Sequence, residues 1–290
     1  MNLAVGFFDG VHLGHRGILS RADAALTFLE HPLSVLAPEK SPPLLMTPEE
    51  RLAAIASALD GSNGINGVDR VRALPFTREL AAELPESFAD WLRRSYPGLE
   101  TVFCGPNWRF GAGGAGDADF LRARGFAVET VPMVRHEGEP ISSTRIRAAL
   151  KAGDLPLANA MLGSPFHISG EVVAGKGEGR RLGFPTINVR PDNPSLPRLL
   201  PSGVYVVETQ HGRAVANWGL APTMGARAWP EPVFEVHILE TSVPSAPLDR
   251  LTVSLLGFLR PERRFASIKE LREQIAADVF SASQYHLNRL

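Results

Sequence analysis

Apolar and polar positions follow two different patterns in the two halves of this chain, and each pattern predicts its own kind of fold. In the first half, short apolar runs alternate with segments whose apolar residues recur every three or four positions, as at Leu52, Ile55 and Leu59. The short runs predict buried strands, and the longer period predicts amphipathic helices. Strands that alternate with helices are typical of a doubly wound, mostly parallel sheet of the Rossmann-like kind. The expected strands are Leu3–Phe8, Val68–Leu74, Thr101–Cys104 and Ala127–Pro132, and the expected helices are Val11–Leu26, one opening at Thr47-Pro48, Ser87–Arg94, Ala118–Arg124, Ser142–Leu150 and Leu155–Leu162.

The pattern changes after Gly163-Ser164-Pro165. Short runs rich in Val, Ile and Thr follow, separated by Gly and Pro, and they predict a six-stranded antiparallel β-barrel closed by a terminal helix. The chain is therefore expected to combine an α/β domain over residues 1–163 with an all-β domain over residues 164–290. The expected barrel strands are His167–Val173, Thr186–Val189, Gly203–Thr209, Ala214–Trp218, Val233–Leu239 and Leu251–Phe258, with a helix at Ser267–Val279 and a loop at Pro191–Pro201.

Composition agrees with two globular domains and narrows the class of protein. The 290 residues are 44% hydrophobic and 21% charged, which suits folded domains that each bury a core. Thirty basic and 31 acidic residues give a net charge of −1, which argues against a general nucleic-acid binder. The single Cys104 excludes an internal disulfide, and no apolar stretch reaches membrane-spanning length. We expect a cytoplasmic protein with neither nucleic-acid nor membrane partners.

The first candidate site follows the first expected strand, where His12 and His15 lie three residues apart. If Asp9 caps the following helix, both imidazoles share one face at its positive end, which favours an anion such as a nucleotide triphosphate. In open α/β sheets ligands bind at the carboxyl ends of the strands, which is where the turn after the first strand lies. The alternative is that one histidine assists the cap and the other fills space. The residues expected to contact ATP phosphates here are Gly6, Phe8, Asp9, Gly10, His12, Gly14 and His15.

A second phosphate clamp is expected at the start of the helix predicted near residue 142. Ser142, Ser143 and Thr144 offer caps and exposed backbone donors, and Arg145 follows them. An ordinary capped helix with surface arginines is the alternative reading. A glycine-dense loop over residues 107–117 also follows a strand, and its composition fits either close approach to a ligand or an ordinary surface loop.

The barrel carries a third group of candidates. Alternating glycines at 175, 177 and 179 can form a backbone anion nest, and Thr186 and Asn188 offer neutral oxygens that suit Mg²⁺ beside ATP phosphates. Glu235 faces away from the apolar side of its strand, where a carboxylate can act as a general base. The alternative for the glycine-rich segment is a hairpin turn leading into an ordinary strand pair. The alternative for Glu235 is a solvated strand residue. The residues expected to contact ATP here are Gly175, Gly177, Gly179, Arg180, Pro185 and Thr186.

Taken together and in this order, the motifs resemble the bifunctional riboflavin kinase/FAD synthetase family of bacteria, over nearly the whole chain. The resemblance implies a nucleotidyltransferase domain followed by a kinase barrel. It rests on Gly6–His15, Thr27-Phe28 with His31-Pro32, Arg109-Phe110-Gly111, Ile141–Arg147, Gly183–Asn188, Gly203-Val204-Tyr205, Phe234–Leu239 and Phe258–Glu262.

The resemblance also implies roles for these residues. In the barrel, Glu235 would accept the proton of riboflavin's hydroxyl as it attacks ATP, with Thr186 and Asn188 holding Mg²⁺, giving FMN. In the first domain, His12, His15 and Arg145 would stabilise charge as FMN attacks the α-phosphorus of a second ATP, giving FAD and pyrophosphate. The implied flavin contacts are His31, Asn107, Arg109 and Arg260.

Three departures from the family pattern bear on the first domain. Phe7 stands where the family usually has Asn, and Asn107-Trp108 stand where it usually has Asp-Phe. The segment between His15 and Thr27 is also shorter than the pattern. A kinase with a weakened transferase domain, a non-catalytic flavin-binding module, and transfer to another phosphorylated acceptor therefore stay open as alternatives. A monomer or weak homo-oligomer that binds only small molecules is expected.

Overall fold

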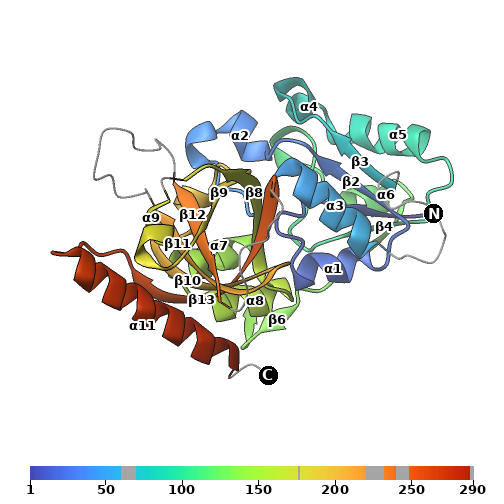
Figure 1. Ribbon diagram of the computed structural model, residues 1–290. Helices are drawn as coiled ribbons and strands as arrows, with labels where there is room; N and C mark the ends of the chain where they lie inside the picture. Colours follow the sequence, from blue (N-terminus) through green and yellow to red (C-terminus); the bar gives the residue numbers. More distant parts are fainter. Residues whose placement is uncertain (60–69, 176, 220–231, 240–247, 288–290) are drawn as a thin grey trace. The chain divides into compact units, whose positions relative to one another are not determined.

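The computed structural model describes residues 1–59, 70–175, 177–219, 232–239 and 248–287. The chain forms two compact units, Met1–Ser143 and Thr144–Leu290 (Figure 1). The first unit is α/β and the second is built around a closed barrel, as the hydrophobic pattern predicts. Among the helices within the described ranges, none combines the length and apolarity needed to cross a bilayer.

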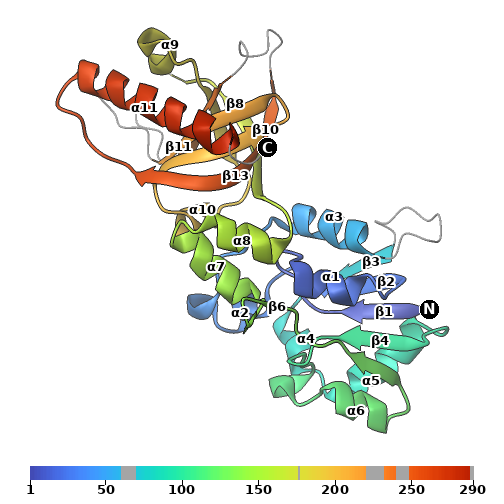
Figure 2. The same cartoon turned by 90° about the horizontal axis from the view of Figure 1, so that it is seen from below.

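The first unit contains a five-stranded parallel sheet in the order β3-β2-β1-β4-β5, with helices on both faces (Figure 2). One face packs α1 and α3 through residues such as Leu19 and Ile55, and the other packs α5 and α6 through Leu92 and Leu121. The predicted doubly wound sheet is thereby confirmed. Its elements are β1 (Asn2–Val5), α1 (Leu13–Leu19), β2 (Ala24–Phe28), α2 (Pro32–Leu36), η1 (Pro38–Lys40), α3 (Pro48–Ala58), β3 (Val71–Leu74), α4 (Arg78–Ala82), α5 (Pro85–Ser95), β4 (Thr101–Cys104), η3 (Ala112–Gly114), α6 (Ala118–Ala123), β5 (Ala127–Thr130), β6 (Arg135–His136) and β7 (Glu139–Pro140).

The predicted helix over Val11–Leu26 is wrong. Helix α1 ends at Leu19, and β2 begins at Ala24. Asp23 fixes this change, because its carboxylate accepts a hydrogen bond from the Asn2 amide at 2.7 Å while its own amide donates to the Asn2 carbonyl at 2.9 Å. The turn at Asp23 thus joins the start of β2 to the start of β1. The spacing of apolar residues in the sequence does not reveal this turn.

Elsewhere in the first unit most predicted elements are found. The strand predicted at Leu3–Phe8, however, ends at Val5, because the chain turns at Phe8 with positive φ, and helices α2 and α4 were not predicted. Thr47 caps α3 in a reciprocal capping box with Glu50, as the Thr-Pro start indicated. The predicted strand at Val68–Leu74 is found at Val71–Leu74, and its first two residues lie outside the described ranges. Cys104 is fully buried at the end of β4, as expected of a small hydrophobic residue.

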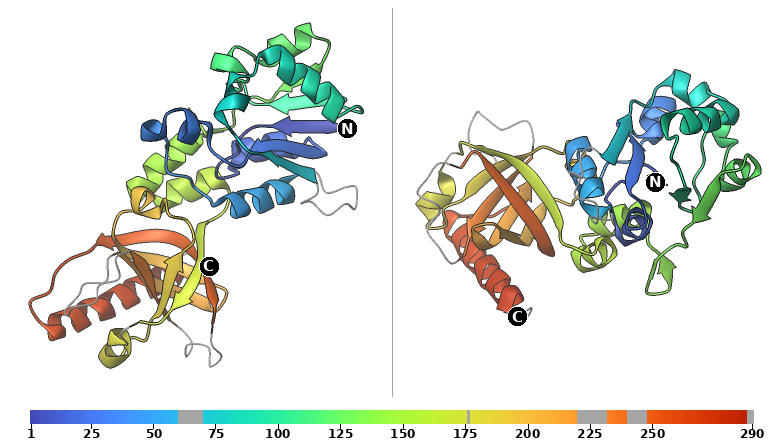
Figure 3. Two further views of the ribbon diagram at one scale, coloured as in Figure 1. Left: turned by 90° about the horizontal axis from the view of Figure 1, so that it is seen from above. Right: turned by 90° about the vertical axis from the view of Figure 1, so that its right-hand side faces the viewer.

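The second unit contains the closed barrel β10-β11-β12-β9-β8-β13, in which all neighbouring strands are antiparallel (Figure 3). Trp218 and Phe234 stack inside it with ring centroids 4.5 Å apart. Helix α11 packs on the outer face against Val204, Val206 and Val215. The elements are α7 (Ser143–Lys151), which begins at the last residue of the first unit, α8 (Leu155–Leu162), β8 (Phe166–Val173), α9 (Glu178–Leu182), β9 (Ile187–Pro191), α10 (Leu196–Leu199), β10 (Gly203–Thr209), β11 (Gly212–Gly219), β12 (Val233–Ile238), β13 (Arg250–Pro261) and α11 (Ile268–Leu287).

Two short helices interrupt segments predicted as turn and loop. Helix α9 follows Gly177, which has φ 71°, and ends at Gly183, which has φ 93°. Positive φ at both ends favours glycine and lets a short helix fit into the connection between β8 and β9, which pair antiparallel. Helix α10 is a single turn within the predicted Pro191–Pro201 loop. Neither helix changes the strand order of the barrel.

Candidate active sites

The first candidate site lies in the loop between β1 and α1, at the carboxyl ends of the parallel strands. Phe8 and Val11 both have positive φ, 58° and 36°, as does Gly10 at 81°. A β-branched residue with positive φ is strained, and such strain persists only where the surroundings hold it. The backbone of the loop is therefore held in an unusual form directly before the two histidines.

His12 and His15 lie together at the start of α1, as their spacing predicted. Their rings stack with centroids 3.6 Å apart and an angle of 16° between planes. His12 is the N-cap of α1, since its Nδ1 accepts a hydrogen bond from the His15 amide at 3.3 Å. A neutral His12 consequently carries its ring proton on Nε2, where it can donate to a ligand.

Asp9 does not cap α1, contrary to the expectation from sequence. The two oxygens of its buried carboxylate share the single N–H of the Leu45 amide, at 3.0 and 3.2 Å. The positive φ of Phe8, Gly10 and Val11 turns the chain so that His12, three residues later, reaches the cap position. Asp9 instead joins this loop to the segment that leads into α3.

The lowered pKa and the hydrogen bonding of His15 are those expected of a residue that binds a ligand. Burial, and then the neighbouring His12, hold the pKa of His15 well below its ordinary value, so the ring is neutral near pH 7. Its Nδ1 is buried and has no hydrogen-bond partner within the described part of the chain. A buried polar atom of this kind calls for an explanation, and a hydrogen bond to a ligand supplies one. The edge of Phe8 covers the ring from the side, with centroids 5.4 Å apart.

The Ser142–Ser143 motif meets the β1–α1 loop, although 134 positions separate the two hydrogen-bonded residues. Ser143 Oγ donates to the Asp9 carbonyl at 2.9 Å, and Gly14 faces the Ile141 carbonyl. The structure thus brings together two of the motifs that sequence analysis singled out for phosphate. Thr144 and Arg145 belong to the second unit, and their predicted phosphate contacts stay predictions.

The predicted flavin contacts of the first unit follow neighbouring strands of the sheet. His31 follows β2 and caps α2, with its Nδ1 accepting from the Leu33 amide at 3.1 Å. Asn107 and Arg109 follow β4 and are exposed, and Arg109 pairs with Asp117 at 3.7 Å. The loops after β1, β2 and β4 therefore share the edge where open α/β sheets bind ligands.

Arg51 is a residue of this region that sequence analysis missed. It is fully buried, and its guanidinium donates hydrogen bonds to the Phe7 carbonyl at 2.9 Å and the Thr27 hydroxyl at 3.0 Å. It also lies 4.0 Å from the centroid of the Phe7 ring. In the sequence, Arg51 follows two glutamates on a helix and resembles an ordinary surface cation. Only the tertiary structure reveals its position.

In the barrel, Asn188, Glu235 and Asn217 form one transverse row, here called the barrel row. Glu235 on β12 is directly opposite Asn188 on β9 and Asn217 on β11. Residues opposite one another across strands point to the same face. Phe234, the neighbour of Glu235, is fully buried inside the barrel, so the barrel row lies on the outer face. Strand alternation correctly placed Glu235 on the face opposite to Phe234, while its catalytic role stays a prediction; sequence analysis did not single out Asn217.

The glycine-rich segment before β9 packs against this row. Gly175 lies so close to the Asn188 amide that a Cβ would overlap it, and Gly179 approaches Thr186 Oγ1 and the Phe184 carbonyl in the same way. Thr186 itself lies just before β9 rather than within it. The glycine-rich segment thus passes close to the Thr186 and Asn188 side chains, whose neutral oxygens are of the kind that suits a hard cation beside phosphate.

Hydrogen bonds fix side chains within and next to the barrel row. His237 Nδ1 lies 2.8 Å from the Pro185 carbonyl, and the Asn217 amide donates to Glu262 at 3.3 Å. Arg260, a predicted flavin contact, makes two hydrogen bonds to Asp278 of α11, at 2.9 and 2.6 Å. These bonds give Arg260 a structural role between the barrel and its helix, while its predicted flavin contact stays a prediction.

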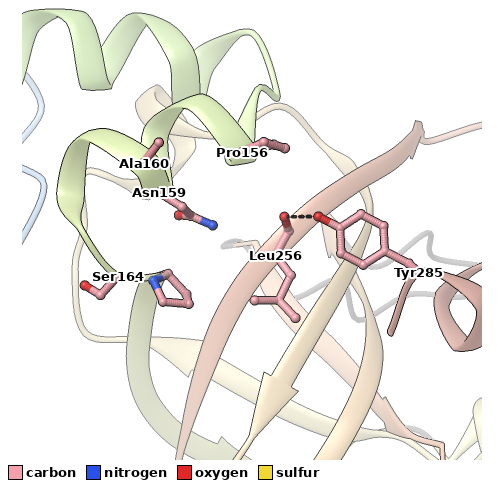
Figure 4. A pocket seen from close by; sticks show the side chains of 7 residues that line it. Pro156, Asn159, Ala160, Ser164, Leu256 and Tyr285 are labelled. Atoms are coloured by element: carbon pink, nitrogen blue, oxygen red, sulfur yellow. Dashed lines mark hydrogen bonds between the residues drawn. The ribbon is translucent and has the colours of Figure 1, made fainter. Parts of the chain in front are cut away.

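A cavity of about 560 Å³ lies elsewhere in the second unit (Figure 4). Two of its polar side chains are engaged, because Asn159 bonds the Leu255 carbonyl and the Phe166 amide while the Tyr285 hydroxyl donates to the Leu256 carbonyl. The cavity therefore offers a ligand mostly apolar surface. Its lining consists of Pro156, Asn159, Ala160, Ser164, Pro165, Leu256 and Tyr285.

Comparison with known proteins assigns a separate family model to each half of the chain. Residues 1–145 match the FAD synthetase model, and residues 162–286 match the riboflavin kinase model. The chain is 37% identical to the bifunctional riboflavin kinase/FMN adenylyltransferase of Pseudomonas fluorescens, over 96% of this chain and 90% of that protein. It is 34% identical to the protein of the same name from Escherichia coli K12, over 98% and 92%.

A relative in Bacillus subtilis carries the same name and is 31% identical over 99% of this chain and 92% of its own. A solved structure from Streptococcus pneumoniae, described as a macrolide-efflux protein, shares 28% identity with a TM-score of 0.77, covering 96% of this chain and 91% of that one. The likeness to that structure extends to the fold of both units.

Proposed function

This chain belongs to the bifunctional riboflavin kinase/FMN adenylyltransferase family, and we propose that its two activities reside in separate sites, one in each unit. The enzyme phosphorylates riboflavin with ATP to give FMN, and then transfers an adenylyl group from ATP to FMN, giving FAD and pyrophosphate. Riboflavin, FMN and ATP are its substrates. The stacked histidine pair on the strained β1–α1 loop is the single observation that most supports the transferase assignment.

For adenylyl transfer, an oxygen of the FMN phosphate attacks the α-phosphorus of ATP and pyrophosphate leaves. His12 offers a ring N–H at Nε2, and His15 offers a neutral, desolvated ring beside it. Donors held in place before the reaction stabilise charge that grows on the phosphates at little cost of reorganisation. Ser143, which is bonded to the same loop, and Arg145, further along α7, are proposed to assist.

For phosphorylation, Glu235 accepts the proton of riboflavin's 5′-hydroxyl while its oxygen attacks the γ-phosphorus, and ADP leaves. The barrel row supports this assignment, because Glu235 has an amide side chain on either side and the glycine-rich segment lies close by. A positioned general base contributes about 10²- to 10⁴-fold to such a step.

Mg²⁺ is proposed as the metal of the kinase site. Thr186 and Asn188 supply neutral oxygens, and Mg²⁺ bound with ATP takes only one or two protein ligands because phosphates and waters fill its other positions. Within the described ranges there is no cluster of three or more His, Cys, Asp or Glu that could hold a metal ion. The ion would supply charge neutralisation on the ATP phosphates.

The location, the oligomeric state and the domain boundary of this protein are also proposals. We propose a cytoplasmic location and a monomer or weak homo-oligomer. The boundary at residue 163 agrees with the start of the riboflavin kinase model at 162. The compact units divide earlier, at residue 143, because α8 packs on the barrel through Asn159. We propose that the segment 144–163 links the two functional domains.

The proposal is tested by incubating the full chain with riboflavin, ATP and Mg²⁺ and separating the flavins by chromatography. FMN should appear first and FAD later. FMN without FAD would favour the kinase-only alternative, and no new flavin would favour a binding module.

A further inference from the structure

Arg51 has an unusual environment for a charged side chain in this fold. It lies on α3 and is fully buried, although it is flanked in sequence by residues typical of a surface helix. Taking a charge out of water is costly unless hydrogen bonds or opposite charges compensate. Burial also lowers the pKa of the Arg51 guanidinium, while Asp9 and Glu30 act in the opposite direction. The contacts of Arg51 therefore carry information about what it does.

Those contacts reach two loops at once. Nη1 donates to the Phe7 carbonyl at 2.9 Å and to the Thr27 hydroxyl at 3.0 Å. Nη2 donates to the carbonyls of Phe28 and Leu29, at 2.8 and 3.0 Å. Phe7 belongs to the loop after β1, and Leu29 belongs to the loop after β2. The planar fork of the guanidinium thus holds two strand ends in one arrangement, which a lysine cannot reproduce.

Phe7 connects Arg51 to His31, which is one of the predicted flavin contacts. Its ring contacts both the guanidinium of Arg51, 4.0 Å from the ring centroid, and the ring of His31, which is nearly perpendicular to it with centroids 4.8 Å apart. The Thr27 hydroxyl donates to the Phe7 carbonyl as well, at 3.2 Å. Phe7 replaces the Asn that the family pattern leads one to expect, and the structure gives the ring two specific partners. The departure is thereby accommodated in this chain.

We propose that Arg51 is a positioning residue for adenylyl transfer. It holds the loop that carries His12 and His15 in a fixed relation to the loop that carries His31, so that bound ATP and FMN meet in the reactive orientation. This inference rests on the proposed adenylyltransferase function. A misplacement of about 1 Å at a remote point can cost about 100-fold in rate.

A purely structural role makes a different prediction. If Arg51 only helped the unit to fold, a substitution would reduce the fraction of folded enzyme. The maximal rate would then fall, while the KM for FMN and for ATP would keep their wild-type values. A positioning role predicts a lower kcat together with a higher KM for FMN, because the loop of His31 moves as well.

The test compares Arg51→Met, Arg51→Lys and Phe7→Leu with the wild-type full chain, using Arg94→Met, an exposed arginine on α5, as the control. FAD formation from FMN and ATP is measured with both KM values, and FMN formation from riboflavin serves as the internal reference. Arg51→Met should lower kcat about 100-fold and raise the KM for FMN several-fold, Arg51→Lys should recover part of the loss, and Arg94→Met should behave as wild type. Added guanidinium ion should partly restore Arg51→Met.

Unchanged KM values with a maximal rate that follows the folded fraction would overturn the inference while leaving the proposed function intact. If Arg51→Met does not fold, Phe7→Leu carries the same test, since it removes the ring that contacts both Arg51 and His31 and should raise the KM for FMN. Failure of the wild-type enzyme to form FAD would instead overturn the adenylyltransferase assignment, and this inference with it.

Discussion

The two candidate sites are built on opposite kinds of backbone. The proposed transferase site lies on a strained loop, where Phe8 and Val11 have positive φ and a buried arginine bonds to the strand ends. The proposed kinase site lies on a regular antiparallel ladder, where strand register alone lines up Asn188, Glu235 and Asn217. A loop site depends on distant contacts that fix the loop, whereas a ladder site depends on the sheet itself. Small local changes should therefore harm adenylyl transfer more readily than phosphorylation.

The largest expected effect concerns the ladder site and removes its base without disturbing its register. Glu235→Gln should lower FMN formation by about 10²- to 10⁴-fold, because the amide cannot accept the hydroxyl proton. FAD formation from supplied FMN should keep its wild-type rate. Both rates are measured separately by chromatography, with Glu208→Gln, an exposed position on β10, as the matched control. A comparable loss of both activities in Glu235→Gln would contradict the separation of the sites.

The corresponding change in the loop site is His15→Ala. Removing one preorganised donor typically costs about 100- to 1,000-fold in kcat, so FAD formation should fall by that factor while FMN formation is spared. His167→Ala, at an exposed histidine on β8, is the control and should leave both rates unchanged. An undiminished rate of FAD formation in His15→Ala would remove the stacked pair from the mechanism.

A paired glycine substitution tests whether a small displacement at the histidine stack slows adenylyl transfer. A Cβ on Gly14 would lie 3.1 Å from His12 Cε1, whereas a Cβ on Gly17 of the same helix would meet only Val134, at 3.9 Å. Both substitutions favour the helix by up to about 1 kcal/mol, so helix propensity cancels in the comparison. Gly14→Ala should displace the ring by a few tenths of an ångström and slow FAD formation about 10-fold. Equal rates for Gly14→Ala and Gly17→Ala would show that the stack tolerates such movement.

The smallest expected effect is a pH dependence of stability in the first unit. The pKa of His15 is lowered by burial and by His12, while the unfolded chain takes up this proton near pH 6.5. The contribution of neutral His15 is therefore fully present above about pH 6.5 and is lost as pH falls below it, by at most about 1.4 kcal/mol per pH unit. Hydrogen exchange of the β1 amides between pH 7.5 and 5 measures this, and His15→Gln should make the dependence shallower. An unaltered dependence in His15→Gln would assign it to other groups.

The two sites also differ in how far the sequence predicts them. Strand alternation gave the correct face for Glu235, since the facing of a strand residue follows directly from the period of its strand. In the first unit the spacing of His12 and His15 predicted their shared face. The expectation that Asp9 caps the helix was wrong, because the Asp9 carboxylate accepts from the Leu45 amide and His12 is the N-cap. The role of Arg51 depends on contacts with residues up to 44 positions away, and local patterns do not encode such contacts.

The helix predicted to run to Leu26 shows the same limit. Residues 13–19 and 24–28 are both apolar enough to continue one period, and the break between them is fixed by the bonds of Asp23 to Asn2. The Thr47 cap, in contrast, was predictable because a capping box is local to its helix. Prediction thus succeeded where the determining contact lies within one element and failed where it joins two.

The central claim is that two independent sites act in sequence, and mixing two defective enzymes tests it most directly. His15→Ala alone should stop at FMN, and Glu235→Gln alone should leave riboflavin unconverted. When both variants are incubated together with riboflavin, ATP and Mg²⁺, FMN released by the first should diffuse to the second, and FAD should accumulate. A mixture that forms no more FAD than the separate variants would contradict the account.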